Sequence, residues 1–108
     1  KKYIFNLRKN SKVLILGATY KKNVPDIRNS LALKIYKKLS KIKKVRFYSY
    51  DPVINDKDAL ENQIINNNLS LKKYNYFILL VDHDSIKKKL KTIKQNKILD
   101  IFGLLNEK

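Results

Sequence analysis

The chain of 108 residues has the size of one domain with a single hydrophobic core, and its 44% hydrophobic content excludes a disordered protein. It has no cysteine, which excludes disulfide bonds, thiolate metal sites and a cysteine nucleophile within this sequence. The net charge of +16 comes almost wholly from lysine, whereas recognition of bases and phosphates favours arginine, so a solvated lysine surface is favoured over nucleic-acid binding.

The first half of the chain predicts a strand, a polar loop and a helix. Residues 1–10 fit the tail of an element that begins before Lys1. Residues 12–16 are apolar on both faces, as in a strand of a covered parallel sheet. After the loop, a helix is expected from Asn29 or Ser30 to about Lys43, with lysines on one face. Its apolar stripe is formed by Leu31, Ala32, Ile35, Leu39 and Ile42.

The second half continues the alternation of strands and helices. Residues 45–50 predict a second strand, and Asp56 is expected to cap a short helix that the asparagines at 66–68 end. Residues 69–74 predict a further helical turn, and residues 76–81 a third strand. A helix capped by Asp84 or Ser85 then runs to about Thr92, before a fourth strand at 97–101. The alternation predicts the α/β class, with a mostly parallel sheet flanked by helices in one domain.

The loop between the first strand and the first helix carries the strongest functional signal. Residues 17–30 read Gly-Ala-Thr-Tyr-Lys-Lys-Asn-Val-Pro-Asp-Ile-Arg-Asn-Ser. Ligands of parallel sheets bind at this carboxyl end of the strands, and the helix N-terminus favours anions, so a phosphorylated ligand is predicted.

Three side chains of this loop are candidate ligand contacts. Lys21 can neutralise a phosphate, and Tyr20 offers an aromatic face and a hydroxyl. Arg28 can bind a diphosphate with its two-pronged guanidinium group. The alternatives are two solvated side chains on a basic loop and an ion pair between Arg28 and Asp26.

Two further strand ends carry polar residues. His83, the only histidine, stands between Asp82 and Asp84, but one imidazole between two adjacent carboxylates lacks the geometry of a metal or catalytic site. We expect a structural role for it at the strand end, and predict no catalytic or metal-binding residue. Asp51-Pro52 is interpreted as a turn, with contact to a ribose hydroxyl as the alternative.

These motifs, taken in order, resemble the C-terminal UDP-binding domain of the UDP-glucose/GDP-mannose dehydrogenase family. The loop matches that family's Gly-small-x-(Phe/Tyr)-Lys, acidic, (Ile/Leu/Thr)-Arg and small polar pattern. Residues 50–52, 81–83 and 98–100 match its Tyr-Asp-Pro, its His-containing strand end and its Asp-tipped last strand. The matching loop residues are Gly17, Tyr20, Lys21, Asp26, Ile27, Arg28 and Ser30. The resemblance covers residues 12–105 and implies a Rossmann-like domain at residues 11–108, with residues 1–10 as its lead-in.

The resemblance also implies an activity. Enzymes of that family oxidise a sugar C6 alcohol to a carboxylate in two NAD-dependent steps through a cysteine-bound intermediate. In them the aromatic-Lys pair, here Tyr20 and Lys21, contacts the UDP-sugar, and the arginine, here Arg28, reaches the NAD pyrophosphate. With no cysteine and only Gly17 and Gly103 as glycines, this chain is expected to be an inactive part of a longer UDP-sugar dehydrogenase. Its NAD would be bound mainly by an upstream N-terminal domain, which with a central domain would be its partner.

The end of the chain suggests a subtype. Asp100 is followed by Ile101, Phe102 and Gly103 rather than by the arginine of glucose-type enzymes. This makes the chain more similar to UDP-N-acetylhexosamine or UDP-N-acetylmannosamine dehydrogenases, and implies a role in polysaccharide biosynthesis. The alternative is a stand-alone basic α/β module that binds nucleic acid or serves in interaction. Because no signal peptide is visible and no apolar run approaches the roughly 18 residues of a membrane span, we expect a soluble, cytoplasmic domain. The resemblance implies a monomeric or weakly associating domain, since enzymes of that family dimerise largely through central helices that this sequence lacks.

Overall fold

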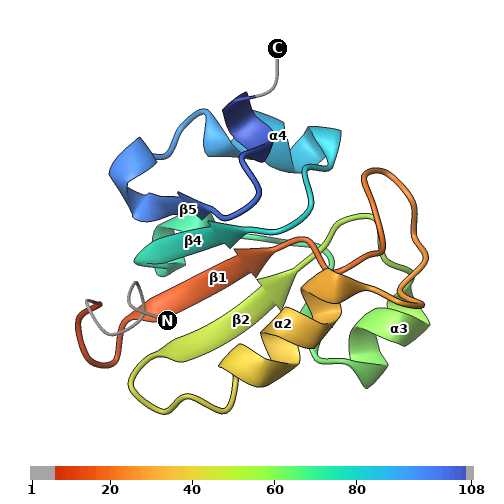
Figure 1. Ribbon diagram of the computed structural model, residues 1–108, viewed down its shortest axis with the longest axis horizontal. Coiled ribbons are helices and arrows are strands. Elements are labelled where there is room, and N and C mark those ends of the chain that lie inside the picture. Colours follow the sequence, from red (N-terminus) through yellow and green to blue (C-terminus); the bar gives the residue numbers. More distant parts are fainter. Residues whose placement is uncertain (1–6, 107–108) are drawn as a thin grey trace.

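The computed structural model describes residues 7–106, and within them a five-stranded sheet has the order β3-β2-β1-β4-β5 (Figure 1). Every strand pair is parallel. The strands are β1 (Lys12–Leu16), β2 (Arg46–Tyr50), β3 (Ile64–Ile65), β4 (Tyr76–Leu79) and β5 (Ile98–Asp100). The helices are α2 (Leu31–Leu39), α3 (Asp56–Glu61) and α4 (Asp84–Leu90), with 3-10 turns η1 (Leu71–Lys73), η2 (Gln95–Lys97) and η3 (Leu104–Asn106). The predicted α/β fold is confirmed, whereas most of the lead-in expected at residues 1–10 lies outside the described residues.

Both faces of the sheet are covered, as the apolar character of β1 predicts. Val13 and Ile15 face one core, while Leu14 and Leu16 face the other. The first core is covered by α2 and α3, which contribute Ala32, Leu33, Tyr36 and Ala59. The second is covered by α4, which contributes Ile86 and Leu90. Burial of each large apolar side chain stabilises the fold by roughly 1.5–3 kcal/mol.

The strand order brings three loops together at one edge of the sheet. Strand β1 pairs with β2 on one side and with β4 on the other. Since all three are parallel, their carboxyl ends share an edge, towards which the arrowheads point in Figure 1. The loop at 17–30 therefore lies between the segments that follow β2 and β4, which begin near Asp51 and Val81.

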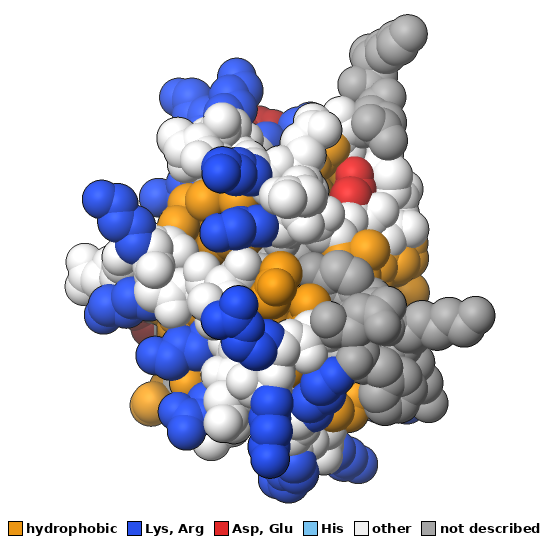
Figure 2. Space-filling view, turned by 90° about the vertical axis from the view of Figure 1, so that its left-hand side faces the viewer, with side chains coloured by type: hydrophobic (Ala, Val, Ile, Leu, Met, Phe, Trp, Pro, Cys, Tyr) orange, Lys and Arg blue, Asp and Glu red, His pale blue; other side chains and the backbone are white. Residues whose placement is uncertain are grey.

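The opposite edge of the sheet, where the strands begin, is rich in basic side chains. Figure 2 shows this side of the molecule, with many lysine and arginine side chains in blue and few acidic ones in red. The basic groups are spread among polar and apolar surface atoms rather than gathered into one block. Much of the positive charge therefore lies away from the loop at 17–30, as expected of a solvated lysine surface.

The first helix differs in detail from its prediction. It ends at Leu39 rather than at about Lys43, because Ser40 forms the C-cap and the next hydrogen bonds have the spacing of a 3-10 turn. Leu31, assigned to the apolar stripe, is 57% exposed. Leu33 and Tyr36 are buried in addition to the rest of the predicted stripe, since Ala32 belongs to the first core and Ile35, Leu39 and Ile42 pack against it.

The later elements also depart from the predicted boundaries. Asn55, rather than Asp56, caps α3 by accepting a hydrogen bond from the backbone N–H of Asp58. Strand β3 was not predicted, so the last strand is the fifth rather than the fourth. His83 occupies the N-cap position of α4, instead of Asp84 or Ser85, and α4 ends at Leu90 instead of about Thr92.

Candidate functional site

The loop at 17–30 begins with a glycine that the packing requires. Gly17 has φ +101°, and a Cβ atom built there would lie 2.5 Å from Cβ of Val81. Its backbone N–H donates to the carbonyl oxygen of Tyr50 at 2.8 Å. The chain can leave β1 between its two neighbouring strands only because this residue has no side chain.

Asp51, the first residue after β2, organises two loops. Its carboxylate is fully buried, and Oδ2 accepts hydrogen bonds from the backbone N–H groups of Ala18 (2.7 Å) and Thr19 (3.0 Å). Its Oδ1 accepts from Val53 (2.8 Å) and Ile54 (3.2 Å), which agrees with the turn predicted here. Because these contacts occupy both oxygens, Asp51 supports the loop rather than presenting a free carboxylate to a ribose.

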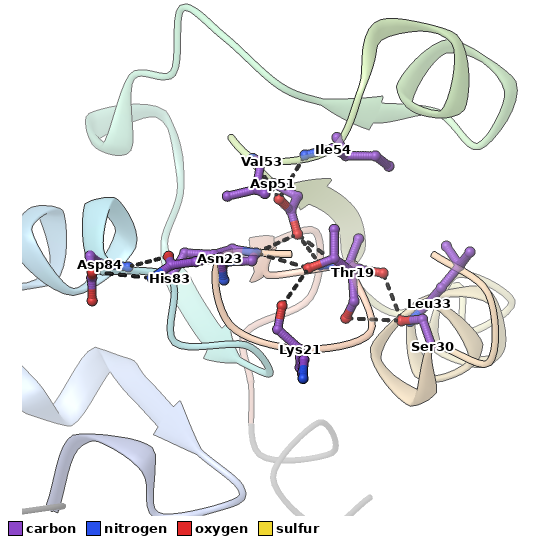
Figure 3. A network of polar contacts seen from close by, with 11 residues as sticks. Thr19, Lys21, Asn23, Ser30, Leu33, Asp51, Val53, Ile54, His83 and Asp84 are labelled. Carbon is purple, nitrogen blue, oxygen red and sulfur yellow. Dashed lines mark hydrogen bonds and ion pairs between the residues drawn. The ribbon is translucent and has the colours of Figure 1, made fainter. Parts of the chain in front are cut away.

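His83, the residue before α4, is fully buried against Asp51 (Figure 3). Its Nε2 lies 2.9 Å from Oδ2 of Asp51 and 3.1 Å from Oγ1 of Thr19. Its Nδ1 accepts a hydrogen bond from the backbone N–H of Asn23 at 2.8 Å. This agrees with a structural role, and among residues 7–106 no group of three or more potential ligands could hold a metal ion.

These donors stabilise the ionised form of the buried Asp51 carboxylate. Burial alone would raise the pKa of Asp51, but hydrogen bonds from His83 and from the N–H groups of Ala18 and Val53 outweigh it. They hold the pKa of Asp51 below its ordinary value.

A second set of contacts fixes the far side of the loop to α4. Asn23 has φ +59°, a conformation that asparagine tolerates better than most residues. Its side-chain amide donates to Oδ2 of Asp84 at 3.1 Å, and the N–H of Asp84 donates back to Oδ1 of Asn23 at 3.3 Å. Lys22 Nζ lies 3.3 Å from Oδ1 of Asp84. The hydrogen bond from Asn23, followed by that from Lys22, lowers the pKa of Asp84.

Tyr20 and Lys21 lie between these two anchored ends. Tyr20 is 56% exposed, while its N–H donates to the carbonyl oxygen of Asp26 at 2.7 Å. The side chain of Lys21 is exposed too, and its carbonyl accepts hydrogen bonds from Oγ1 of Thr19 (3.2 Å) and the N–H of Val24 (3.2 Å). The backbone is thus fastened while both predicted ligand-binding side chains face outwards.

Arg28 forms the ion pair with Asp26 that was the alternative to a diphosphate contact. Its Nε and terminal nitrogen lie 2.9–3.2 Å from both carboxylate oxygens of Asp26, yet the Arg28 side chain is 86% exposed. The hydrogen bond from Arg28 lowers the pKa of Asp26. A shallow hollow of about 280 Å³ is lined by Tyr20, Asp26, Arg28 and Asn29. The structure therefore brings Tyr20 and Arg28 together, while Lys21 is not among the residues that line this hollow.

Ser30 joins the loop to the first helix. Its hydroxyl donates to the carbonyl oxygen of Ala18 at 2.7 Å and accepts from the N–H of Leu33 at 3.1 Å, which caps α2. At the loop end nearest β1, the backbone N–H groups of Ala18 and Thr19 are thus bonded to Asp51, and the carbonyl oxygen of Ala18 is bonded to the hydroxyl of Ser30. The amides of Ala18 and Thr19 are therefore not available as a phosphate cradle, in contrast to a typical phosphate-binding loop.

Sequence reasoning did not single out Thr19 and Asn23, and it assigned no common site to Asp51 and His83. The available signal was that a polar residue stands within four positions of the end of three buried strands: Thr19 after β1, Asp51 after β2 and His83 after β4. None of the helices in the described part of the chain is long and apolar enough to cross a membrane.

The family model described as the UDP-glucose/GDP-mannose dehydrogenase family, UDP binding domain, matches residues 14–107. No curated protein sequence matches the chain.

Several solved structures share the fold. A UDP-D-ManNAc dehydrogenase from Pyrococcus horikoshii is similar with 20% identity and a TM-score of 0.60. The UDP-N-acetyl-mannosamine dehydrogenase Cap5O from S. aureus is similar with 26% identity and a TM-score of 0.63. Each match covers 90% of this chain and 22% of the other chain. SirC, a precorrin-2 dehydrogenase, is similar with 12% identity and a TM-score of 0.52, over 88% of this chain and 46% of its own.

Proposed function

Since this chain belongs to the UDP-glucose/GDP-mannose dehydrogenase family, whose UDP binding domain it matches, we propose that it binds the nucleotide of a UDP-sugar. It would do so within an NAD-dependent UDP-sugar 6-dehydrogenase that oxidises a C6 alcohol to a uronate for polysaccharide biosynthesis. The chain spans 22% of the two sugar-nucleotide dehydrogenases it is similar to, so we assign the oxidation to other parts of such an enzyme.

The observation that carries the proposal is the anchored loop at the carboxyl edge of the sheet. Tyr20 and Lys21 project from a backbone whose neighbours are bonded to Asp51, His83 and Asp26. An ammonium group there would neutralise the diphosphate, and the tyrosine ring would pack against the nucleotide-sugar. Because the loop is ordered by contacts within the chain, ligand binding would lose little conformational entropy.

The residues of this loop fit NAD through one side chain, Arg28. The amides of Ala18 and Thr19 are bonded to Asp51, so this loop offers no backbone cradle for a dinucleotide pyrophosphate. Arg28 is exposed beside the start of α2, and its guanidinium could exchange Asp26 for a cofactor phosphate. When bound, NAD accepts the hydride of the alcohol. Arg28 would hold its pyrophosphate while other domains bind the rest of the cofactor.

We further propose an N-acetylated hexosamine as the sugar. The carboxylate of Asp100 accepts hydrogen bonds from the N–H groups of Leu104 and Leu105, so it closes the turn after β5. Residues 101–108, which come next, include no arginine. Two of the similar structures are those of UDP-N-acetylmannosamine dehydrogenases. Tighter binding of UDP-N-acetylmannosamine than of UDP-glucose would support this assignment, and the reverse order would contradict it.

Calorimetric titration of the chain with UDP tests the binding function. We expect saturable binding with a Kd in the high micromolar range or weaker, equivalent to about −5 kcal/mol, which persists at moderate salt. A parallel titration with a single-stranded oligonucleotide is the control. Steeply salt-dependent oligonucleotide binding without UDP binding would favour a nucleic-acid-binding module, and binding of neither would contradict a nucleotide-binding role.

A further inference from the structure

We propose that His83 is a positioning residue for the nucleotide, through which the sheet holds the segment that carries Tyr20 and Lys21. This rests on the proposed function and adds to it a residue that touches no ligand. His83 contacts three parts of the edge at once: Thr19 at the start of the segment, Asn23 at its end and Asp51 after β2 (Figure 3).

The hydrogen-bond pattern assigns the tautomer of the imidazole. Nδ1 accepts from the backbone N–H of Asn23 at 2.8 Å, so it carries no proton. The ring proton is therefore on Nε2, which donates to Oδ2 of Asp51 at 2.9 Å. The hydroxyl of Thr19 donates to the carbonyl of Lys21, so its oxygen also faces Nε2 with a lone pair at 3.1 Å. Each ring nitrogen has one defined role.

The two ends of the segment depend on this ring in different ways. At the first end, Asp51 holds the N–H groups of Ala18 and Thr19, and His83 orients that carboxylate. At the second end, His83 itself accepts the N–H of Asn23, the residue with φ +59°. Between these ends lie residues 20–22. A ring without nitrogens would leave Asn23 without its acceptor and Asp51 without its side-chain donor.

Burial makes this arrangement specific to the histidine. The His83 side chain is fully buried, as is that of Asp51, so water does not replace a lost partner without a change in packing. Helix α4, which His83 precedes, packs against the second core through Ile86, which is 1% exposed and lies among apolar residues. Ile86 therefore offers a control that lowers stability without removing a hydrogen bond to the loop.

The test compares His83→Phe, His83→Gln and Ile86→Val in the complete chain. For each, the Kd for UDP, the unfolding free energy in urea, and the hydrogen exchange of the Asn23 N–H by NMR are measured. We expect His83→Phe to weaken UDP binding by about tenfold or more and to speed exchange at Asn23. His83→Gln, which keeps an acceptor and a donor, should recover part of the affinity. Ile86→Val should lower stability while leaving the Kd for UDP within about twofold.

Several outcomes would overturn the proposal. One is unchanged UDP affinity and Asn23 exchange in His83→Phe, and another is an equal loss of affinity in Ile86→Val at matched stability. If His83→Phe does not fold, the ¹⁵N spectrum of the wild-type imidazole decides: a proton on Nδ1 contradicts the assigned hydrogen bonds, and a proton on Nε2 supports them. A wild-type chain that does not bind UDP contradicts the proposed function, whereas unchanged Asn23 exchange contradicts the anchor itself.

Discussion

Lys21 and Lys22 are adjacent lysines whose surroundings differ. Lys22 is paired with Asp84, with side-chain exposures of 44% and 74% for the two partners. Lys21 stands at the apex of the anchored loop, where it is our candidate for the diphosphate contact. The two positions therefore separate a specific contact from a general attraction by basic charge.

We predict that Lys21→Ala weakens UDP-sugar binding by about 2 kcal/mol, near 30-fold, because it removes a charge-assisted hydrogen bond. Fold stability should be nearly unchanged, since the side chain is exposed. Lys22→Ala is the control. Its loss of UDP-sugar affinity should be several-fold smaller, because Lys22 pairs with Asp84 and such an exposed ion pair contributes little. Titration calorimetry at low and high salt provides the comparison. Equal losses that vanish at high salt would reduce the site to diffuse electrostatic attraction.

Arg28 is predicted to act on the cofactor rather than on the UDP-sugar. In a dehydrogenase that contains this domain, Arg28→Ala should raise the KM for NAD more than the KM for the UDP-sugar. The loss of one bidentate contact should cost roughly 1.5–3 kcal/mol. Steady-state kinetics with each substrate varied in turn gives the answer. Unchanged kinetics with NAD would leave Arg28 as the partner of Asp26 only.

At the scale of elements, the contact between β1 and the segment after β4 depends on Gly17. We predict that Gly17→Ala destabilises the chain by about 2–5 kcal/mol, because it combines an unfavourable positive φ with an overlap against Val81. Gly103→Ala is a useful comparison: Gly103 also has positive φ, at +66°, but no atom lies within 4 Å of the position that an alanine Cβ would take. Urea unfolding should show the larger loss at Gly17, and equal losses would mean that backbone strain alone matters.

Asp51 ties together the segments that follow β1, β2 and β4, so its ionisation should appear in the pH dependence of stability. Its pKa is lower in the folded chain than its ordinary value. The stabilisation is therefore fully present above the unfolded pKa of about 4, and is lost as pH falls through the folded pKa. We predict that Asp51→Asn is less stable than wild type at neutral pH and that the gap narrows below about pH 4. Urea unfolding at neutral and at acidic pH measures both, and a gap independent of pH would mean that Asp51 is not ionised.

The elements predicted from sequence were those with a clear hydrophobic pattern. Strand β1 is a continuous apolar run because both of its faces are buried, and the apolar stripe of α2 identified that helix although it misplaced Leu31. Strand β3 has only Ile64 and Ile65, which is too short to show an alternation, and it follows Gln63 with φ +58°. Helix ends shifted by a few residues because the caps depend on local hydrogen bonds that several neighbouring polar residues could make.

The anchoring of the loop could not be predicted for a different reason. Asp51 and His83 are 32 residues apart, and His83 and Asn23 are 60 apart, so no local pattern relates them. Their meeting depends on the placement of β1 between β2 and β4, and alternation of strands and helices does not define that order. The sequence motif did single out Gly17, Tyr20, Lys21 and Arg28, since these lie within one loop. The structure explains the requirement for Gly17, and the ligand contacts of the other three stay predictions.

At the scale of the whole molecule, we predict that the chain binds nucleotide but does not by itself catalyse the oxidation. The chain has no cysteine, and the loop after β1 offers no cradle for a dinucleotide. We therefore expect no NADH to form when the chain alone is mixed with NAD and any UDP-sugar, even where UDP binds. Absorbance at the NADH wavelength is the measurement, and sustained NADH formation would contradict the assignment of the oxidation to other domains.

The short outer strands of the sheet have a consequence for self-association. Strand β3 has two residues and β5 has three, so each side of the described sheet exposes only a brief row of backbone groups to a neighbouring molecule. Addition of another copy by strand pairing needs a longer ladder of hydrogen bonds, and the excess of lysine repels a like-charged copy. The sheet is thereby protected at its sides from edge-to-edge aggregation.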